Sequence, residues 1–389
     1  MKIAFISHSF PYPPNKGERQ RALFLIKALA KTHQVTLFSV TKEDIPQSDI
    51  DQLCQYVDKV YCFNAPPVIK FLQAGFSLLK GNSLTEGYFY SCKLKRALER
   101  EGPFDLFFGY CSSSVQYLQD ERETPAVMDM VDVDSAKWSL YAQKSSLLKK
   151  SLYKLEAKRV LELEKRSIER CDWIGLTTQF EIEKIKNLTT EAEKLVVLKN
   201  GVDLTTWKRT TELKAQPCVI GFMGQMDYQP NIEAIRWFHD QVFDLIRKKV
   251  PEAQFLVIGR NPSESLVNSC LHAEFTGEVE RVEPYLEKAA VFIAPMQETI
   301  GVPVKVLQAL SFGVPVVATS YVAKGLESSD SQAAPLVEVD APQEMADRVV
   351  ELLKDVDKRS ELGQRSRSYA ESELGWGRTE ELLRKLVPN

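Results

Sequence analysis

CVIGFMG, at residues 218–224, is a short apolar run that ends on a glycine, and AQFLVIG repeats the pattern at residues 253–259. Short buried strands that alternate with helices form a parallel sheet covered on both faces. The second half of the chain is therefore predicted to be a doubly wound α/β domain. Four further apolar runs continue the series, at residues 273–277, 290–295, 315–319 and 334–339.

The first half of the chain shows the same alternation. We therefore expect an α/β chain of two Rossmann-like, doubly wound parallel-sheet domains that face an interdomain cleft. Ligands bind such folds at the carboxyl ends of the strands. The apolar runs of this half lie at residues 2–7, 34–40, 105–110, 126–131, 172–177 and 194–198.

A polar, Thr-rich stretch separates the two halves and predicts a domain boundary. The predicted divisions are an N-terminal domain at residues 1–203, a linker at 204–217, a C-terminal domain at 218–370 and a final segment at 371–389. The last segment contains an amphipathic helix, GWGRTEELLRKL. The sequence leaves open whether this helix packs back on the first domain.

The composition excludes several classes of protein. A chain of 389 residues with 44% hydrophobic and 26% charged residues is neither disordered nor fibrous, and a formal net charge of −3 gives no footprint for nucleic acid. Seven cysteines without a CxxC pair favour a reduced cytoplasmic compartment over disulfides or a zinc site. Since no apolar run reaches membrane-spanning length, we expect a cytoplasmic protein that at most lies on a membrane surface.

Five motifs along the chain carry a family resemblance. Together they resemble the family 4 glycosyltransferases of the GT-B fold. The first two resemble more narrowly the branch associated with exosortase and exopolysaccharide gene clusters, and the resemblance covers nearly the whole chain. The motifs are SHSFPYPPNKGERQR (7–21), DMVDVDSAKW (129–138), KNGVDLTTW (199–207), GFMGQMDYQPN (221–231) and KVLQALSFGVPVVAT (305–319).

The resemblance implies a transferase of the EC 2.4 class. Such an enzyme moves a sugar from a nucleoside diphosphate sugar to an acceptor hydroxyl, with retention of configuration and without a metal or cofactor. The second domain would bind the nucleotide sugar and the first domain the acceptor. The acceptor is expected to be a carbohydrate or a lipid-linked glycan in bacterial surface polysaccharide synthesis.

Negative charge accumulates on the leaving diphosphate, so the donor site needs a cradle of cations or N–H groups. The resemblance places Gly17 and Gly224 against the diphosphate, although a glycine between a strand and a helix is also an ordinary tight turn. Arg19 and Arg21 follow Gly17 on the first turn of a helix. They would reach the acceptor or a phosphate, or else lie on a solvated face.

The donor site departs from the family pattern at two places. An Arg and a Lys often follow the second-domain glycine, but residues 225–231 contain neither. Two glutamates eight residues apart normally contact the sugar and the ribose, and here these positions are Ile300 and Gln308. A Gln amide still bonds a ribose hydroxyl, whereas Ile bonds no sugar hydroxyl.

Other residues are expected to compensate for these losses. Lys305, after the loop that begins at Gly301, would contact the diphosphate, or else be an exposed helix lysine. Glu298 would shift into the sugar site. Arg260 would stack on or pair with the diphosphate, and the backbone near Val279 would read the base.

Three carboxylates in DMVDVDS mark the end of a first-domain strand. We expect Asp129 or Asp132 to orient the acceptor hydroxyl or bind the transferred sugar. The alternatives are helix N-capping by Asp134 or Ser135 and a divalent metal site. We do not predict any of these residues to be a metal ligand. His8, at the end of the first strand, would meet the donor or acceptor, and Lys137 is assigned to the acceptor.

Two stretches of the first domain predict contact with a membrane surface. PPVIKFLQAGFSLLKGN (66–82) mixes large apolar residues with lysines, and the helix at 144–167 presents Lys149, Lys150, Lys154 and Lys158 along one side. A basic face with apolar edges is typical of a peripheral membrane protein. The alternative is an insertion that packs on the domain beside a solvated helix.

Three other functions are weighed against the transferase. The loss of both glutamates and the phosphate cations suggests a catalytically silent relative that binds a nucleotide sugar or serves as a scaffold. A nicotinamide oxidoreductase would need a G-x-G-x-x-G after the first strand, which is absent. An epimerase of the same fold would need carboxylates on both faces of the sugar, and the acidic cluster supplies one side.

Overall fold

The computed structural model describes residues 1–41, 44–118, 123–209, 218–297, 301–326 and 333–387. The chain forms two compact units, the first of Met1–Lys199 with Gly377–Asn389 and the second of Asn200–Trp376. The crossing at Lys199 precedes the expected linker at 204–217. Leu204 and Trp207, at the start of that stretch, pack as apolar side chains against the core of the second unit. Residues 210–217 lie outside the described part of the chain.

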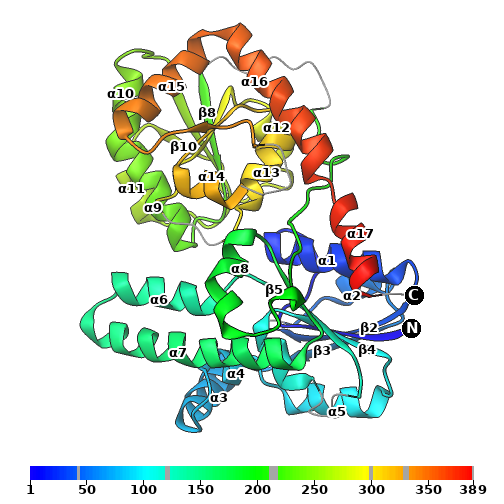
Figure 1. Ribbon diagram of the computed structural model, residues 1–389. Coiled ribbons are helices and arrows are strands. Elements are labelled where there is room, and N and C mark those ends of the chain that lie inside the picture. The colour runs from blue at the N-terminus through cyan, green and yellow to red at the C-terminus, as the bar shows by residue number, and fades with distance from the viewer. Residues whose placement is uncertain (42–43, 119–122, 210–217, 298–300, 327–332, 388–389) are drawn as a thin grey trace. The chain divides into compact units, whose positions relative to one another are not determined.

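A seven-stranded parallel sheet forms the centre of the first unit, in the order β3-β2-β1-β4-β5-β6-β7 (Figure 1). Alternate residues of each strand enter cores on opposite faces, as Ala4 and Ile6 do on one face and Ile3 and Phe5 on the other. Both faces are covered, which is why the strands read as continuous apolar runs. The strands are β1 (Lys2–Ser7), β2 (Gln34–Thr41), β3 (Lys59–Asn64), β4 (Leu106–Tyr110), β5 (Ala126–Val131), β6 (Trp173–Leu176) and β7 (Leu195–Val197).

Helices connect these strands. Leu383 and Leu386 of the C-terminal helix α17 enter the core of the first unit, and Glu380 pairs with Lys31 of helix α1 at 2.8 Å. The C-terminal helix therefore packs on the first unit, a point that the sequence left open. The helices are α1 (Gly17–Ala30), α2 (Gln47–Leu53), α3 (Pro67–Leu79), α4 (Leu84–Tyr88), α5 (Cys92–Glu101), α6 (Asp134–Lys144), α7 (Leu147–Arg170), α8 (Gln179–Ile185) and α17 (Gly377–Leu386), with short 3₁₀ turns η1 (Ser112–Tyr117), η2 (Lys186–Leu188) and η3 (Ala192–Lys194).

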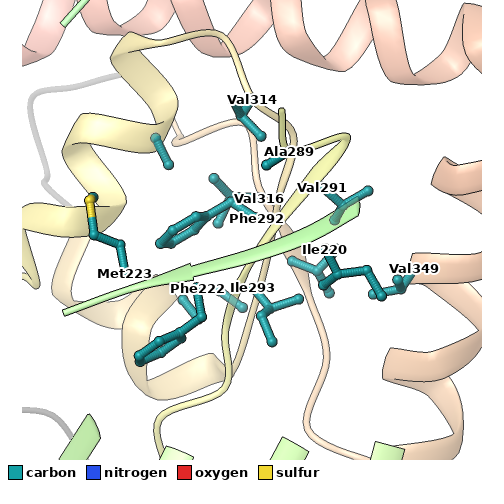
Figure 2. Close-up of a cluster of buried hydrophobic side chains, with 14 of the residues drawn as sticks. Ile220, Phe222, Met223, Ala289, Val291, Phe292, Ile293, Val314, Val316 and Val349 are labelled. Atoms are coloured by element: carbon teal, nitrogen blue, oxygen red, sulfur yellow. The ribbon is translucent and has the colours of Figure 1, made fainter. Parts of the chain in front are cut away.

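The second unit has a six-stranded parallel sheet in the order β10-β9-β8-β11-β12-β13. Figure 2 shows its core, where Ile220 and Phe222 of β8 lie beside Val291 and Ile293 of β11. These are buried, mostly β-branched or aromatic residues of the kind that favours strands. The strands are β8 (Val219–Met223), β9 (Gln254–Ile258), β10 (Ala273–Phe275), β11 (Val291–Ala294), β12 (Val316–Ala318) and β13 (Val337–Glu338).

The helices of the second unit follow its strands in the same alternation (Figure 1). The predicted fold class, an α/β chain of two doubly wound parallel-sheet domains, is thereby confirmed. The helices are α9 (Gln229–Phe238), α10 (Asp244–Arg247), α11 (Glu264–Ser269), α12 (Glu283–Leu286), α13 (Val304–Ser311), α14 (Ser320–Leu326), α15 (Pro342–Lys354) and α16 (Val356–Tyr369), with π-helical turns η4 (His239–Phe243) and η5 (Ala370–Leu374).

The strand orders fix where each unit is able to bind a ligand. In the first sheet β1 lies between β2 and β4, and in the second β8 lies between β9 and β11. The chain reverses its direction of progress across the sheet at these strands. Loops on either side of such a switch point diverge and leave a crevice at the carboxyl ends. The loops after β1, β4, β8 and β9 are therefore the places to look for functional side chains.

Candidate functional site

A cluster of three residues follows β8 in the second unit. Gly224 directly follows β8, Asn231 lies on the first turn of α9, and Lys305 lies on the first turn of α13. The Lys305 Nζ atom donates a hydrogen bond to Asn231 Oδ1 and lies 4.3 Å from the centre of the Phe222 ring. Asn231 Nδ2 in turn donates to the carbonyl oxygen of Gln225 at 2.7 Å. The loop after β8 is thus tied to the cation.

The absence of a side chain at Gly224 leaves the room that this cluster occupies. A Cβ atom at that position would lie 2.6 Å from Asn231 Nδ2 and 3.2 Å from Lys305 Nζ. Sequence analysis placed the diphosphate against Gly224, and in the structure the side chains of Asn231 and Lys305 approach this glycine. The structure brings the predicted residues Gly224 and Lys305 together, and it adds Asn231, whose side chain bridges them.

The charge of Lys305 lacks compensation in the described part of the chain. The side chain is half-buried, and burial lowers the pKa of Lys305 to about 7. No carboxylate among the described residues pairs with its ammonium group. An anion placed beside Nζ would therefore favour the charged form. This is the electrostatic property that a diphosphate site needs.

The loop after β9 is locked against the loop after β8. Gly259 has a φ of +149°, and a Cβ atom there would lie 1.7 Å from the Gly224 carbonyl oxygen, so the backbone approach excludes any side chain. The next residue, Arg260, accepts a hydrogen bond on its carbonyl from the Met226 N–H at 2.9 Å. Its guanidinium lies 3.9 Å from the exposed Glu278 carboxylate. Arg260 is thus placed at the same sheet edge with a loosely held head group.

The remaining donor residues are distributed more widely. Gln308 lies on α13 and is 7% exposed, so most of its side chain is withdrawn from the surface. Gly301 has a φ of +66°, which favours glycine at the turn before α13. Val279 is half-buried and packs against the core of the second unit. Glu298 and Ile300 lie outside the described residues.

Arg21 and Asp129 form a buried ion pair in the first unit. Arg21 Nε and Nη2 donate to the two Asp129 oxygens at 2.6 and 2.9 Å, and Nη2 also donates to the Leu198 carbonyl oxygen at 2.7 Å. The side chains are 2% and 0% exposed. Burial opposes the charge of Arg21, but the adjacent Asp129 carboxylate leaves the pKa of Arg21 raised.

This pair bears on two sequence-based assignments. Arg21 was expected to contact the acceptor and Asp129 to act in catalysis, yet both head groups are withdrawn from the surface and bonded to each other. The pair joins helix α1 to strand β5 in the interior of the first unit.

Asp132 differs from Asp129 in its surroundings. Strand β5 loses its regular register with β6 between Asp129 and Val131, and Val131 has a φ of +70°, a strained value for a β-branched residue. This bend leaves Asp132 half-buried, where it accepts a hydrogen bond from Thr177 Oγ1 at 2.8 Å. Burial, with the nearby Glu181 carboxylate, raises the pKa of Asp132 to about 6. The charge state of Asp132 therefore changes just below neutral pH.

His8 lies in an aromatic environment after β1. Its ring is stacked on Tyr110 at 5.9 Å and meets the edge of Phe89 at 5.0 Å, and Nε2 lies 3.9 Å from the Glu18 carboxylate. The contact with His8 lowers the pKa of Glu18 to about 2. The other ring nitrogen, Nδ1, is buried without a hydrogen-bond partner among the described residues.

Three further polar atoms, from the segments that follow β1 and β4, share this property. Buried polar groups in native proteins are normally paired, so a group of unpaired atoms at one sheet edge indicates where water or a ligand binds. Gly17 begins α1 beside them, and Arg19 Nη1 contacts Asn15 at 3.5 Å. The three atoms near His8 that lack a partner among the described residues are Ser9 Oγ, Arg19 Nε and Ser112 Oγ.

Helix α6 receives its N-terminal cap from distant residues. Ser135 donates to Glu164 of α7 through both its backbone N–H, at 2.9 Å, and its hydroxyl, and the Val133 N–H donates to Glu181 of α8 at 2.8 Å. The side-chain N-cap expected of Asp134 or Ser135 is therefore wrong. Lys137, assigned to the acceptor, lies 3.8 Å from the carboxylate of Asp134, one turn earlier on the same helix.

Two structural features are absent from the described residues. These residues contain no group of three or more His, Cys, Asp or Glu side chains arranged to hold a metal ion. Nor does any helix in that part of the chain have the length and apolar character needed to cross a membrane.

Comparison with known proteins identifies one family match. Residues 217–355, which lie within the second unit and make up less than half of the chain, match the family described as glycosyl transferases group 1. No curated protein matches the sequence. The match supports the expected transferase of the EC 2.4 class.

Solved structures resemble the chain over its whole length. They include Anabaena HepE in complex with UDP and glucose (TM-score 0.67, 14% identity, 99% of this chain and 98% of that one) and the sucrose-phosphate synthase of Thermosynechococcus elongatus (0.71, 17%, 99% and 98%). Another is S. aureus TarM, as a mutant in complex with fondaparinux, α-GlcNAc-glycerol and UDP (0.69, 12%, 100% and 100%). At such identities the likeness shows the fold, and it is the predicted GT-B fold.

Proposed function

We propose that this chain is a glycosyltransferase that moves a sugar from a nucleoside diphosphate sugar to an acceptor hydroxyl. The observation that carries the proposal is the cluster of Lys305, Asn231 and Gly224, located inside the region that matches the glycosyl transferases group 1 family. A half-buried cation without a carboxylate partner in the described chain, placed on the first turn of a helix, suits a leaving diphosphate.

Lys305 would take the place of the Arg and Lys that the family resemblance leads one to expect after Gly224. Its ammonium group is held by Asn231, so it needs little reorganisation to meet a phosphate oxygen. HepE was solved with UDP and TarM with UDP, which makes a uridine nucleotide a reasonable first donor to test. In the proposed donor site Arg260 supplies a second cation, Gln308 and Glu298 serve the ribose and sugar, and Gly301 and Val279 shape the loops.

The acceptor side of the proposal rests on the first unit. Asp132 would accept a hydrogen bond from the attacking hydroxyl, and the unpaired atoms around His8 and Arg19 would contact the acceptor. Gly17 and Lys137 border the same sheet edge. The buried pair of Arg21 and Asp129 would keep α1 and β5 in register beneath these groups.

Several finer points belong to the proposal as well. Retention of configuration, independence of metals, membership of family 4 and its exosortase-associated branch, and a role in bacterial surface polysaccharide synthesis follow from the resemblance of the five motifs. TarM was solved with a saccharide ligand, which supports a glycan or lipid-linked glycan as acceptor. Contact of the first unit with the cytoplasmic surface of a membrane is part of the same proposal.

A catalytically silent relative is the second candidate. Ile300 stands where the family resemblance predicts a sugar-binding glutamate, and residues 225–231 lack the usual cations. Such a protein would bind a nucleotide sugar without transferring it. Turnover of any donor, including slow hydrolysis that disappears in Lys305→Ala, would rule this candidate out.

A thermal-shift screen of UDP, GDP, ADP, CMP and dTDP and of their sugar conjugates tests the proposal. A ligand that binds the native state raises Tm by mass action. We expect one nucleotide to raise Tm and Lys305→Ala to weaken its affinity roughly 10- to 100-fold, the loss typical of a hydrogen bond to a charged group. Lys354→Ala, an exposed lysine on α15, is the matched control and should bind as the wild type does. The absence of a shift with every nucleotide would refute a donor site.

A further inference from the structure

Helix α3 (Pro67–Leu79) of the first unit buries small and polar residues and exposes its large apolar ones, the reverse of an ordinary surface helix. Its buried stripe consists of Lys70, Ala74 and Ser77, which are basic, small and hydroxylic. Its large apolar side chains point to the surface and are between 46% and 87% exposed. These are Val68, Ile69, Phe71, Leu72, Phe76 and Leu79.

Packing against α4 fixes this orientation. A Cβ atom on Gly87 of α4 would lie 2.5 Å from Ser77 Cβ and 2.7 Å from Ala74 Cα, so the two helices approach too closely for any large side chain between them. Ser77 Oγ donates to the Ser83 carbonyl oxygen at 2.9 Å, and Lys70 Nζ donates to the Thr41 carbonyl oxygen at 2.5 Å. The inward face is therefore specifically bonded, and the apolar face has to look outward.

An outward apolar face of this size is unusual for a helix in water. Surface helices of globular proteins normally bury their apolar stripe and expose the polar one. A contiguous exposed apolar surface marks a site that binds a membrane, another protein or an apolar ligand. In Figure 1, α3 lies beside α4, below α7.

The charges around the apolar face are basic. Helix α3 contains no acidic residue, and the next residue, Lys80, places its Nζ 4.4 Å from the centre of the Phe76 ring. The chain then meets α7, because a Cβ atom on Gly81 would lie 3.6 Å from Arg159 Nη1. Leu152 and Leu155 of α7 lie seven and four residues before Arg159, on the same side of that helix, and both are 40% exposed.

Exposed lysines continue along this part of α7, at positions 149, 154 and 158. The first nine residues of the helix, Leu147–Leu155, contain no acid, and the acid that follows them, Glu156, is buried and caps α4. An apolar face with a basic rim matches the boundary of an anionic bilayer, where acyl chains take up the apolar residues and head groups attract the cations.

We propose that α3 docks the first unit on an anionic lipid surface, with its outward apolar residues in the acyl-chain boundary and the lysines of α7 among the head groups. A line of aromatic rings connects this face to the region of the proposed acceptor. Phe71 meets Tyr88 at 5.6 Å, Tyr88 meets Phe89 at 5.1 Å, and Phe89 meets His8 at 5.0 Å. On the proposed function, an acceptor whose lipid tail stays in the bilayer would present its head group near His8.

Flotation with lipid vesicles tests this proposal without any donor or acceptor. The full-length protein is mixed with vesicles of phosphatidylglycerol and phosphatidylethanolamine, or of phosphatidylcholine alone. We expect flotation with the anionic vesicles, weaker flotation with the neutral ones, and a loss on raising the salt concentration. The triple variant Phe71→Ser, Leu72→Ser, Phe76→Ser should bind anionic vesicles at least tenfold more weakly.

A matched triple variant on the second unit is the control. Leu271→Ser, Tyr321→Ser, Val356→Ser removes three apolar residues that are also more than half exposed, and it should float as the wild type does. A charge variant, Lys149→Glu, Lys154→Glu, Lys158→Glu, should weaken anionic binding while α3 is intact. The proposal would be overturned if the wild-type protein floated with neither type of vesicle, or if the α3 variant floated with anionic vesicles as fully as the wild type.

A second copy of the chain is the competing occupant of the α3 face. Light scattering without vesicles should show a monomer. A dimer that the α3 variant converts to a monomer, without vesicle binding by the wild type, would assign the face to self-association and overturn the lipid proposal. Nucleotide-induced thermal shifts separate this inference from the proposed function: vesicle binding without any nucleotide shift would leave the docking helix standing and refute the donor site.

Discussion

The guanidinium of Arg21 donates to both carboxylate oxygens of Asp129, at 2.6 and 2.9 Å, across 108 positions of sequence. The pair joins the second turn of α1 to the strand that ends at Val131, and both side chains lie in the interior. Two charges removed from water depend on each other, because the loss of either one leaves the other buried without the partner to which it is hydrogen-bonded.

Removal of Arg21 alone is therefore predicted to destabilise the first unit strongly. Arg21→Leu would leave the Asp129 carboxylate buried and unpaired, at a cost of roughly 3–5 kcal/mol in the free energy of unfolding. Urea unfolding followed by circular dichroism measures this change. The double variant Arg21→Leu, Asp129→Leu should recover part of the loss, because it removes both buried charges.

Arg96→Ala is the control for this prediction. Arg96 is an exposed arginine on α5 of the same unit, and its loss should change stability by less than about 0.5 kcal/mol. If Arg21→Leu unfolded at the wild-type urea concentration but lost the ability to use an acceptor, the original assignment of Arg21 to the acceptor would be restored.

Nucleotide binding is predicted to weaken as the pH rises above neutral. Burial lowers the pKa of Lys305 to about 7, while a bound diphosphate favours the charged ammonium group. Above pH 7 the free protein must take up a proton in order to bind. The nucleotide contributes little to this change, since the second ionisation of a terminal phosphate has a pKa of about 6 and is largely complete at pH 7. Between pH 7 and 9 the affinity should fall by up to about tenfold per pH unit.

Calorimetric titration at pH 7, 8 and 9, in two buffers of different ionisation enthalpy, measures both the affinity and the proton uptake. Lys305→Arg provides the comparison, because a guanidinium stays charged throughout this range. Its affinity should be nearly flat with pH. An equal decline in the wild type and in Lys305→Arg would show that another group takes up the proton.

The sheets were predictable from sequence because their chemistry is local. Each strand is buried on both faces, so runs such as VIGFM and QFLVI carry the signal within five residues. Gly224 and Lys305 could also be chosen, since both lie in short motifs next to a strand or a helix start. Asn231 belongs to the motif GFMGQMDYQPN as well. Its contact with Lys305 could not be predicted, because it depends on how α9 and α13 pack beside Gly224.

The contacts that sequence analysis did not predict join residues far apart in the chain. Arg21 and Asp129 read as an exposed helix arginine and a strand-end acid until α1 is placed over β5. The caps of α6 come from Glu164 and Glu181, 29 and 48 positions away from the groups they accept from. In α3, large apolar residues cover most of the helix circumference. Only the close approach of Gly87 decides that the polar stripe faces inward.

Asp132 is predicted to control the pH dependence of sugar transfer on its acidic side. A carboxylate accepts a hydrogen bond or a proton from the attacking hydroxyl only when it is ionised. Burial, with the nearby Glu181, raises the pKa of Asp132 to about 6, so the rate should fall about tenfold for each pH unit below 6. Asp132→Asn should reduce turnover by roughly 10²- to 10⁴-fold, the usual contribution of a positioned acid or base.

The two units allow this effect to be separated from donor binding. Asp132 belongs to the first unit and the proposed diphosphate site to the second, so the nucleotide-induced thermal shift should persist in Asp132→Asn. Asp134→Asn, two residues later on α6, is the matched control and should keep most of the activity together with the acidic limb of the pH profile. Because an amide does not titrate, any residual activity of Asp132→Asn should be independent of pH near 6. An unchanged acidic limb in that variant would assign the titration to another group and remove Asp132 from the mechanism.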